Sequence, residues 1–520
     1  MGTVQNPILK GFYPDPSVCR VGEDFYIVTS TFAYFPGIPV FHTRDFCHIR
    51  QIGNVLTTDS QLPLDGVGCS HGLFAPTIRY HNGTFYVVCT NISRGGNFIV
   101  TATDPAGPWS EPHWLEGADG IDPSLFFDDD GTCYYVGTRG DSVNERYYGD
   151  NELYVVRVDL DRFCFVGEPT PVWKGALRDS VWPEAPHLYK IDGMYYLMIA
   201  EGGTSDDHSV TIARSETLLG PYTGYKKNPV LTHRHLGRDY PVKNVGHGDL
   251  VQAADGSWYM LMLASRPCEG SSNLGRETFF AKVQWEDGWP VVNPGEGRLT
   301  ALTQTTLADY PLEPVFGHYA FDCMTWQTLD PRILFLRNPY RENYTFCSEG
   351  VRLALSPVTL CDLDSPTFLC VRQTSFNFAT ETNVTFSPAL PGEFAGLALV
   401  QNDRFHIRLE YGLTDTGHVL RVVVCEDGQE TVVKESAVQA EELALKLVQH
   451  GQSLSFYYKT GQDTDCTAPY MKLDCAVNAH RMSTEHAGGF VGCTVGVYAT
   501  SNGISSQNSA LFEYLEYQDL

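Results

Sequence analysis

Within the first 260 residues, the chain repeats one pattern of apolar and polar positions five times. Each copy has a short apolar stretch, a polar turn that usually ends in Gly, and a second stretch rich in aromatic residues around a Tyr. Such pairs of stretches predict β-hairpins. Five repeats at this spacing predict a five-bladed β-propeller with four strands and long loops in each blade. The anchoring tyrosines, spaced 60, 48, 62 and 63 residues apart, are Tyr26, Tyr86, Tyr134, Tyr196 and Tyr259.

The repeat also indicates which residues begin the first strand of each hairpin. Counting back 11 or 12 residues from each Tyr reaches Asp15, Ala75, Asp122, Glu184 and His247. If these strands are the innermost of their blades, their first residues converge around the propeller axis at one end. Three of the five residues are acidic, so the sequence predicts a pocket in which carboxyl groups from separate blades meet.

After residue 290 the repeat stops and the pattern changes. Segments such as FHIRLEYG, HVLRVVVCEDG, SLSFYYKTG and TVGVYATSNG alternate in polarity between closely spaced turns, which predicts an antiparallel β-sandwich of about 200 residues, of the concanavalin A-like or jelly-roll type. We therefore expect an all-β protein with a propeller at 1–300, an ordered connector at 301–318 and a sandwich at 319–520 that contributes to the pocket. Only AVQAEELALKL at 437–447 has a helical period.

The connector carries enough apolar side chains to pack against both domains. A flexible tether would be rich in Gly and Ser or in Pro. The apolar residues between positions 290 and 318 that instead favour an ordered connector are Leu299, Leu302, Leu307, Tyr310 and Leu312.

Composition and charge exclude several classes of partner. The chain has 36 basic and 62 acidic residues, a net charge of −26, and no cluster of Lys or Arg, so neither nucleic acid nor an anionic membrane surface is an expected partner. No apolar run is long enough to span a membrane, and no signal peptide is visible. The 15 cysteines form no CxxC pair and no zinc-like ligand set, which favours reduced thiols in a cytoplasmic protein. A secreted protein that has lost its leader would look the same.

Six phrases of the predicted propeller carry a resemblance to a known family. They are NPILKGFYPDPSVCRVGEDFYIVTSTFAYFPGIPV, GIDPSLFFDDDG, WPEAPHLYK, AEGGT, NVGHGDLV and LGRETFF. The set resembles glycoside hydrolase family 43, in particular its β-xylosidase-like members, and LVQNDRFHIRLEYG and GGFVGCTVGVYATSNG more weakly resemble their appended sandwich. The resemblance implies an inverting enzyme that removes xylose or arabinose from oligosaccharides and requires no cofactor.

The resemblance gives each of the three acids a catalytic role. Asp15 in YPDPS matches the general base, and Glu184 in WPEAPH matches the general acid. Asp122 in IDPS matches a third acid whose charge should raise the pKa of Glu184. An inverting enzyme needs its base and acid about 6.5–9.5 Å apart, which separate blades can supply. A lone Asp-Pro pair is more often a structural turn, but repetition in register favours catalysis here.

Four further positions are candidates for substrate binding. Arg276 in LGRETFF resembles the family's pocket arginine, whose donors can bind sugar hydroxyls and keep the base ionised; a surface ion pair is the alternative. Phe32 matches an aromatic wall of the pocket, although an isolated Phe would usually be core. Thr204 in EGGT matches a small residue at the pocket edge. Phe74 stands where the family usually has Trp, so the apolar platform is expected to be smaller.

His247 and Phe490 complete the candidate set. In relatives, the histidine that His247 in GHGD matches faces the pocket floor and, in some, helps to hold a hydrated Ca²⁺ near the axis. Because Ca²⁺ prefers six to eight oxygen ligands, such an ion would keep most of its water, and a core hydrogen-bond donor is the alternative role. Phe490 in GGFVG matches a residue that reaches from the second domain over the pocket; its alternative is a buried sandwich aromatic.

Three functions remain compatible with the sequence. The first is an exo-acting β-xylosidase that releases xylose from the non-reducing end of β-1,4-xylo-oligosaccharides. The second is an α-L-arabinofuranosidase, or an enzyme with both activities, acting on arabinose-substituted oligosaccharides. The third is a non-catalytic sugar-binding propeller, which has no need of the acids at 15, 122 and 184. The oligomeric state stays open.

Overall fold

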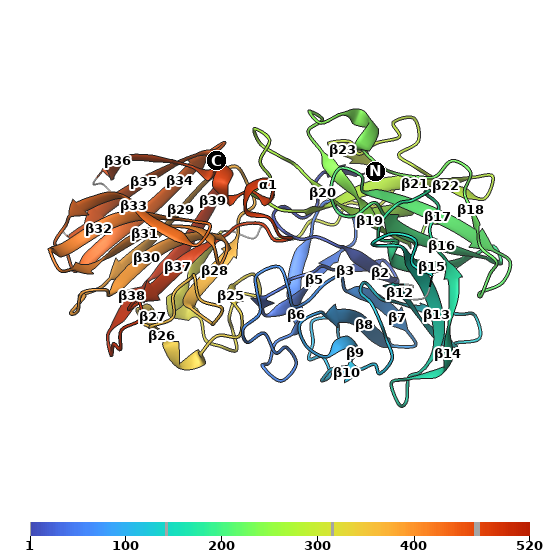
Figure 1. Cartoon of the computed structure of the whole chain (residues 1–520), viewed down its shortest axis with the longest axis horizontal. Helices are drawn as coiled ribbons and strands as arrows, with labels where there is room; N and C mark the ends of the chain where they lie inside the picture. The colour runs from blue at the N-terminus through green and yellow to red at the C-terminus, as the bar shows by residue number, and fades with distance from the viewer. Residues whose placement is uncertain (1, 141–143, 314–316, 462–468) are drawn as a thin grey trace.

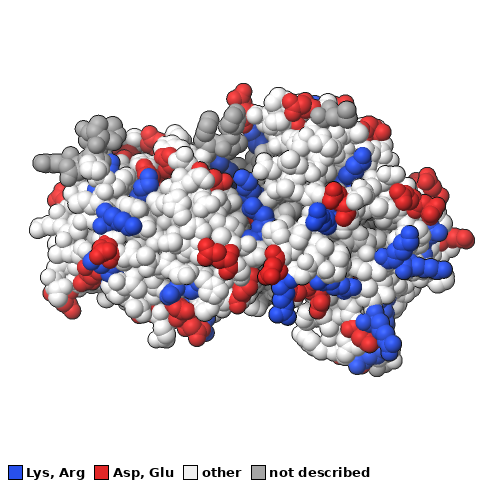
Figure 2. All heavy atoms as spheres, turned by 90° about the horizontal axis from the view of Figure 1, so that it is seen from above, with Lys and Arg blue, Asp and Glu red and all other residues white. Residues whose placement is uncertain are grey.

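The computed structural model describes residues 2–140, 144–313, 317–461 and 469–520. They form a propeller, on the right of Figure 1, and a β-sandwich on the left. Apart from short 3₁₀ turns, the only helix in these ranges is α1 (Thr484–Ala487). No helix in the described residues is long and apolar enough to cross a membrane. On the face shown in Figure 2, basic side chains lie among acidic ones.

The propeller consists of five antiparallel four-stranded sheets within the described residues. Blade 1 is β2 (Ser17–Val21), β3 (Asp24–Val28), β5 (Gly37–Thr43) and β6 (Arg50–Leu56), and blade 2 is β7 (Thr77–His81), β8 (Thr84–Asn91), β9 (Gly96–Ala102) and β10 (His113–Trp114). Blade 3 is β11 (Ser124–Phe127), β12 (Cys133–Gly140), β13 (Asn151–Asp159) and β14 (Cys164–Trp173). Blade 4 is β15 (Glu184–Ile191), β16 (Met194–Glu201), β17 (Ser209–Ser215) and β18 (Thr223–Gly224), and blade 5 is β19 (Lys243–Gln252), β20 (Trp258–Ser265), β21 (Glu277–Glu286) and β22 (Trp289–Val292).

The predicted hairpins are the first two strands of each blade. The five anchoring tyrosines lie in β3, β8, β12, β16 and β20, the second strands. The first strands contact one another in a closed ring, in the order β2, β7, β11, β15, β19 and back to β2. The five-bladed propeller is therefore confirmed, with the first strand of each hairpin innermost.

Two antiparallel sheets form the sandwich. The nine-stranded sheet contains β24 (His318–Ala320), β26 (Tyr344–Cys347), β27 (Gly350–Ala354), β29 (Asn377–Thr385), β34 (Glu442–His450), β35 (Ser453–Thr460), β36 (Met471–Asn478), β38 (Ser509–Phe512) and β39 (Tyr514–Asp519). The eight-stranded sheet contains β33 (Gln429–Ala437), β32 (Gly417–Glu426), β31 (Phe405–Thr414), β30 (Phe394–Asn402), β37 (Thr494–Thr500), β28 (Thr367–Arg372), β25 (Leu334–Leu336) and β4 (Tyr34–Phe35). This is the expected sandwich architecture.

The helical period at 437–447 does not correspond to a helix in the structure. This segment contains the last residue of β33 and the first six of β34. Leu443, Leu445 and Leu447 are all buried, and they also follow the two-residue period of a strand. Because β34 is paired along its whole length with β29 on one side and β35 on the other, cross-strand pairing overrides the local preference.

The two domains share a sheet and a hydrophobic core. Strand β4, which branches from blade 1, pairs with β25 at the edge of the eight-stranded sandwich sheet, with Phe35 opposite Phe335 and Tyr34 opposite Leu336. These four residues belong to one continuous buried cluster that extends from the propeller loops into the sandwich. The propeller thus supplies both a strand and apolar side chains to the second domain.

The connector contacts the propeller closely. Its strand β23 (Leu302–Gln304) pairs with β1 (Thr3–Gln5) near the N-terminus. Leu299 is buried in a propeller cluster, and the Tyr310 ring lies 4.6 Å from the guanidinium of Arg44. The expectation that Leu302 is packed was wrong, because its strand exposes alternate residues and its side chain is 59% exposed. Residues 314–316 of the predicted connector lie outside the described residues.

A shared core predicts that the domains unfold together. Phe335→Ala should lower the free energy of unfolding by about 3–5 kcal/mol, and urea denaturation followed by fluorescence and by circular dichroism should give one coincident transition. The matched control is Leu390→Ala, at an exposed site of the sandwich, which should change stability by no more than about 0.5 kcal/mol. A sandwich that unfolds separately while the propeller keeps its stability would contradict the shared core.

Candidate active site

The first residues of the five inner strands converge on one small pocket. Asp15, Ala75 and Asp122 lie two residues before β2, β7 and β11; Glu184 opens β15, and His247 lies inside β19 at an irregularity in its pairing. The pocket has a volume of about 80 Å³. All nine candidate residues line it, and the full set of described lining residues is Asp15, Phe32, Phe74, Ala75, Ile121, Asp122, Glu184, Thr204, His208, His247, Arg276 and Phe490.

Asp15 is held in the pocket as a buried carboxylate. Its backbone adopts a left-handed conformation, with φ of 56°, which Asp tolerates better than most residues. Its Oδ2 accepts a hydrogen bond from Ser30 Oγ at 2.5 Å, and its Oδ1 accepts one from Arg276 Nη1 at 3.0 Å. Burial acts to raise the pKa of Asp15, but the charge of Arg276, followed by the nearby His247 imidazole and the Ser30 hydroxyl, holds this pKa below its ordinary value. Asp15 is therefore ionised at neutral pH.

Arg276 joins Asp15 to other parts of the pocket. The same Nη1 atom donates to Thr204 Oγ1 at 3.0 Å, on the loop after β16. Arg276 Nε is buried and has no hydrogen-bond partner within the described residues. An unpaired buried donor is unfavourable unless a ligand or water satisfies it. Arg276 therefore keeps one unsatisfied buried donor beside the pocket while it stays paired with Asp15.

Three phenylalanines form the apolar wall of the pocket. The rings of Phe32 and Phe490 are stacked, with centroids 6.1 Å apart and planes at 22°. Phe74 meets both edge-on, at 5.7 Å from Phe32 and 6.0 Å from Phe490. Phe490 comes from the sandwich domain and is 38% exposed, so it is not a core residue of that domain. The second domain thus completes the wall of a pocket that the propeller begins.

A close backbone contact brings the Phe490 segment to the pocket. A Cβ atom on Gly492 would lie 2.5 Å from the backbone carbonyl of Leu274, and one on Gly275 would lie 2.8 Å from the Gly492 nitrogen. Only glycine allows this approach. The Phe490 amide also donates to Ser70 Oγ at 2.8 Å. Because Gly275 directly precedes Arg276, the same contact fixes the sandwich against the arginine of the pocket.

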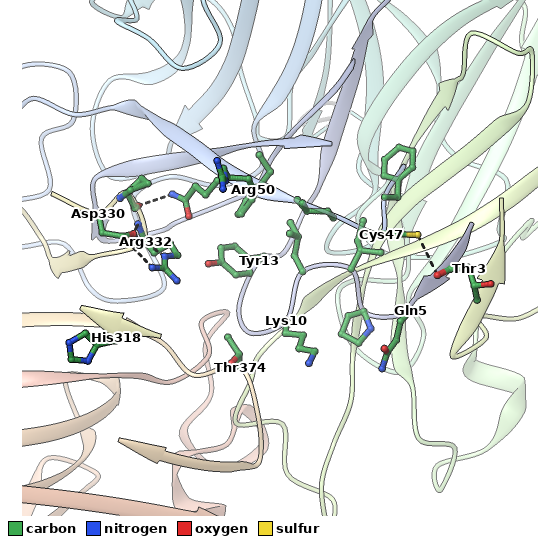
Figure 3. A pocket seen from close by; sticks show the side chains of 18 residues that line it. Thr3, Gln5, Lys10, Tyr13, Cys47, Arg50, His318, Asp330, Arg332 and Thr374 are labelled. Atoms are coloured by element: carbon green, nitrogen blue, oxygen red, sulfur yellow. Dashed lines mark hydrogen bonds and ion pairs between the residues drawn. The ribbon is translucent and has the colours of Figure 1, made fainter. Parts of the chain in front are cut away.

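A wider cleft between the propeller and the sandwich has a different character. Figure 3 shows this cleft, of about 1050 Å³, with Tyr13 and Lys10 on one side and His318 and Thr374 on the other. Asp330 is the one acidic residue among its described lining residues, and its carboxylate pairs with Arg332 at 2.6 Å. Acid–base chemistry on a glycosidic bond needs two carboxyl groups, so the smaller pocket is the candidate active site.

Family comparison agrees with this geometry. Residues 4–290 match the family "Glycosyl hydrolases family 43", and residues 322–518 match "Beta xylosidase C-terminal Concanavalin A-like domain". The chain belongs to glycoside hydrolase family 43. It is a glycoside hydrolase, and its concanavalin A-like second domain accounts for the sandwich.

Relatives of this family 43 enzyme match it along its whole length. A xylosidase/arabinosidase of Butyrivibrio fibrisolvens is 47% identical and covers 100% of both chains. A non-reducing end alpha-L-arabinofuranosidase of Bacteroides ovatus is 36% identical over 100% of this chain and 95% of its own. The crystal structure of a xylan beta-1,4-xylosidase from Bacillus halodurans superposes with a TM-score of 0.92 at 32% identity, over 99% of this chain and 100% of that chain.

In this family 43 enzyme, Glu184 is kept protonated near neutral pH. Burial, followed by the charge of Asp15, raises the pKa of Glu184 to about 8, against an opposing effect of Arg276. We expected the charge of Asp122 to cause this shift, but burial contributes most and Asp15 comes next. The pKa of Asp122 is itself raised, by burial and then by Glu184 and Asp15. The pocket therefore holds one carboxylate, at Asp15, beside carboxyl groups that resist ionisation.

The described residues around His247 offer few direct ligands for Ca²⁺, and the expected hydrated ion stays a prediction. Its Nδ1 lies 3.7 Å from Asp15 Oδ1, but that carboxylate already pairs with Arg276. Burial lowers the pKa of His247 and keeps it neutral. The described clusters of three or more side chains that could share an ion do not include His247. These residues do not fit the oxygen-rich set that Ca²⁺ requires.

Ala75, Ile121 and His208 line the pocket but were not among the candidates. Ala75 occupies the repeat position of the acids, and Ile121 directly precedes Asp122, so the repeat could have indicated both. His208 Nδ1 donates to the Asn244 carbonyl at 2.9 Å, and burial lowers the pKa of His208 to about 3. Nothing in the surrounding sequence marks this histidine.

The charge of Arg276 should set both limbs of the pH–rate profile. If Asp15 acts as the base and Glu184 as the acid, kcat/KM of the wild type should fall at low pH and again above about pH 8. Arg276 lowers the pKa of both groups. Arg276→Met should therefore move both limbs upward in pH, measured on an aryl glycoside. Arg352→Met, at an exposed sandwich site, should move neither; unchanged limbs in Arg276→Met would contradict these electrostatics.

Phe490 should contribute to substrate binding more than to stability. Phe490→Ala should raise KM about tenfold, the equivalent of one aromatic contact of about 1.4 kcal/mol. The change in melting temperature should be small because the side chain is partly exposed. Ile504→Ala, a similarly exposed apolar site on the same domain, is the control and should leave KM unchanged. A Phe490→Ala variant that loses stability but keeps its KM would make the residue a structural one only.

Proposed function

We propose that this enzyme is an inverting exo-glycosidase that releases xylose from the non-reducing end of β-1,4-xylo-oligosaccharides. The observation that carries the proposal is the pairing, in one small pocket, of an ionised Asp15 with a protonated Glu184 from different blades. A base and an acid in these states are what single-displacement hydrolysis of a glycoside requires.

The proposed reaction is a direct displacement by water. Asp15 accepts a proton from the water as its oxygen attacks the anomeric carbon. The bond from that carbon to the leaving oxygen breaks, and Glu184 donates its proton to the leaving oxygen. After the step, Asp15 is protonated and Glu184 is a carboxylate. Proton exchange with solvent returns both groups to their starting protonation states. Arg276 keeps Asp15 ionised before the step.

The shape of the pocket supports action at chain ends. Its small volume, of about 80 Å³, favours binding of a single terminal sugar. Phe490 closes one side from the sandwich domain, and its ring stacks on Phe32. The substrate is accordingly an oligosaccharide that presents a terminal pentose. We propose that a water molecule and the protein's carboxyl groups suffice and that no cofactor takes part.

An arabinofuranosidase activity is the second candidate. It is supported by Phe74, which stands where the family usually has Trp, and by the 36% identical relative named as an arabinofuranosidase. A smaller aromatic at this wall leaves more room for a five-membered ring. Both sugars would use the same pair of Asp15 and Glu184.

We also propose that the enzyme works in the cytoplasm. Every described cysteine is a free thiol, and about half of them are buried. Free thiols are typical of a reducing compartment. Fractionation of the cells that produce the protein, with activity measured in each fraction, tests this location.

The sugar preference can be measured directly. The measurement compares kcat/KM for 4-nitrophenyl β-D-xyloside with kcat/KM for 4-nitrophenyl α-L-arabinofuranoside. We expect the larger value for the xyloside. A larger kcat/KM for the arabinofuranoside would make the second candidate the main activity. Hydrolysis of neither compound, nor of xylobiose, would refute both and leave a sugar-binding propeller.

The two carboxyl groups should respond differently to the leaving group. Glu184→Gln should lower kcat on xylobiose by about 10²–10⁴-fold, but much less on a dinitrophenyl xyloside, whose leaving group needs no proton. Asp15→Asn should lower kcat by a similar factor on both substrates. Asp192→Asn, in the exposed turn of a propeller hairpin, is the control and should keep full activity. Equal losses for Glu184→Gln on both substrates would contradict its role as the acid.

A further inference from the structure

Three chemically active side chains share one cross-strand row of the sandwich. His406 in β31 lies opposite Cys425 in β32, and Cys425 lies opposite Glu430 in β33. Directly opposed residues on neighbouring strands point to the same face of a sheet. A fourth side chain, Cys361, comes from the loop between β27 and β28. Its Sγ lies 3.7 Å from Cys425 Sγ and 3.7 Å from Glu430 Oε1.

His406 is fully buried beside these groups without a hydrogen bond. Neither of its ring nitrogens has a hydrogen-bond partner among the described residues. The nearest recorded approach is from Nε2 to Glu430 Oε1, at 3.7 Å, which is too long for a hydrogen bond. A buried polar group left unpaired costs free energy, so the ring requires a partner that protein atoms do not supply.

The two thiols and the imidazole are spaced to fill three positions of one tetrahedral metal ion. One ligand atom each from Cys361, His406 and Cys425 lies within 4.8 Å of the others. With Zn–S bonds of about 2.3 Å, two sulfurs on a tetrahedral zinc lie about 3.8 Å apart. The observed Sγ–Sγ separation of 3.7 Å matches this value, and it far exceeds the bond length of about 2.05 Å in a disulfide.

The surrounding residues hold the ligands in place. Arg337 is fully buried; it donates to the Asp364 carbonyl at 2.6 Å in the Cys361 loop and pairs with Asp403, three residues before His406. Glu430 Oε1 accepts a hydrogen bond from Arg408 Nη1 at 2.8 Å. Supporting hydrogen bonds of this kind orient the ligands of protein metal sites.

Charge also favours a divalent ion here. Once both thiols are deprotonated, as ligation requires, they and the Glu430 carboxylate would carry three negative charges, which Zn²⁺ and the Arg408 guanidinium would neutralise. Cysteine and histidine select zinc over the harder Mg²⁺ and Ca²⁺. Binding would release the two thiol protons to solvent as two Zn–S bonds form.

We propose that Cys361, His406 and Cys425 bind a structural zinc ion, and that the Glu430 carboxylate, 3.7 Å from Cys361 Sγ and from His406 Nε2, moves in to take the fourth position. Four protein ligands leave no open position, as in structural rather than catalytic zinc sites, and none of the four lines the active-site pocket. The ion fastens the Cys361 loop to the end of the eight-stranded sheet. No zinc-like set is visible in the sequence because the ligands are 45, 19 and 5 residues apart and meet only across three strands and a loop.

Metal titration of the full-length protein tests the site. The protein is stripped with a chelator under a non-thiol reductant and titrated with Zn²⁺ against a chromophoric competitor, and separately with Co²⁺. One equivalent of Zn²⁺ should bind and raise the melting temperature, and Co²⁺ should give a thiolate charge-transfer band with the visible spectrum of tetrahedral cobalt. Mg²⁺ should not compete.

Matched cysteine variants decide which thiols take part. Cys361→Ser should weaken Zn²⁺ binding by at least about 100-fold and remove both the thermal shift and most of the charge-transfer band, with glycosidase activity of the folded protein retained. Cys323→Ser, at an exposed thiol outside the cluster, should behave as the wild type. Failure of the reduced wild type to bind Zn²⁺, or binding that Cys361→Ser leaves unchanged, would overturn the proposal.

Discussion

The buried ion pair between Arg276 and Asp15 is the interaction on which the pocket depends. Asp15 is only 5% exposed, and a carboxylate so buried stays ionised only with a paired charge and hydrogen bonds. Asp15 comes from blade 1 and Arg276 directly precedes β21 of blade 5, so the pair forms where the ring of blades closes. The same arginine reaches Thr204 of blade 4. The charge of the base is thus tied to closure of the propeller.

The second domain is part of this arrangement because it shares a β-sheet and a buried core with the propeller. Strand β4 of the propeller extends a sandwich sheet, and one buried cluster spans both domains. The contact between Gly275 and Gly492 then places Phe490 beside Arg276. A pocket built from two domains can be narrower than the open end of a propeller, which accounts physically for a preference for chain ends.

The repeat in the sequence was sufficient to predict the hairpins of the five blades and the residues at which their inner strands begin. Tyr26 and its four counterparts located the hairpins, and counting back from them led to five residues that all line the pocket. Properties that arise only from packing in the folded protein could not be predicted from the sequence. Burial contributes most to the raised pKa of Glu184, His208 has no marker in its local sequence, and the alternation of Leu443, Leu445 and Leu447 was masked by an apparent helical period. The cluster of cysteines and His406 is assembled by the register of three strands and by the loop that carries Cys361.

The stereochemistry of the first product tests the central claim most directly. If Asp15 activates a water molecule while Glu184 protonates the leaving oxygen, each turnover inverts the anomeric carbon. Proton NMR of xylobiose or an aryl β-xyloside during the first minutes of hydrolysis should show α-xylose before mutarotation produces the β-anomer. Initial formation of β-xylose would mean a covalent intermediate on the protein and would contradict the roles given to both carboxyl groups.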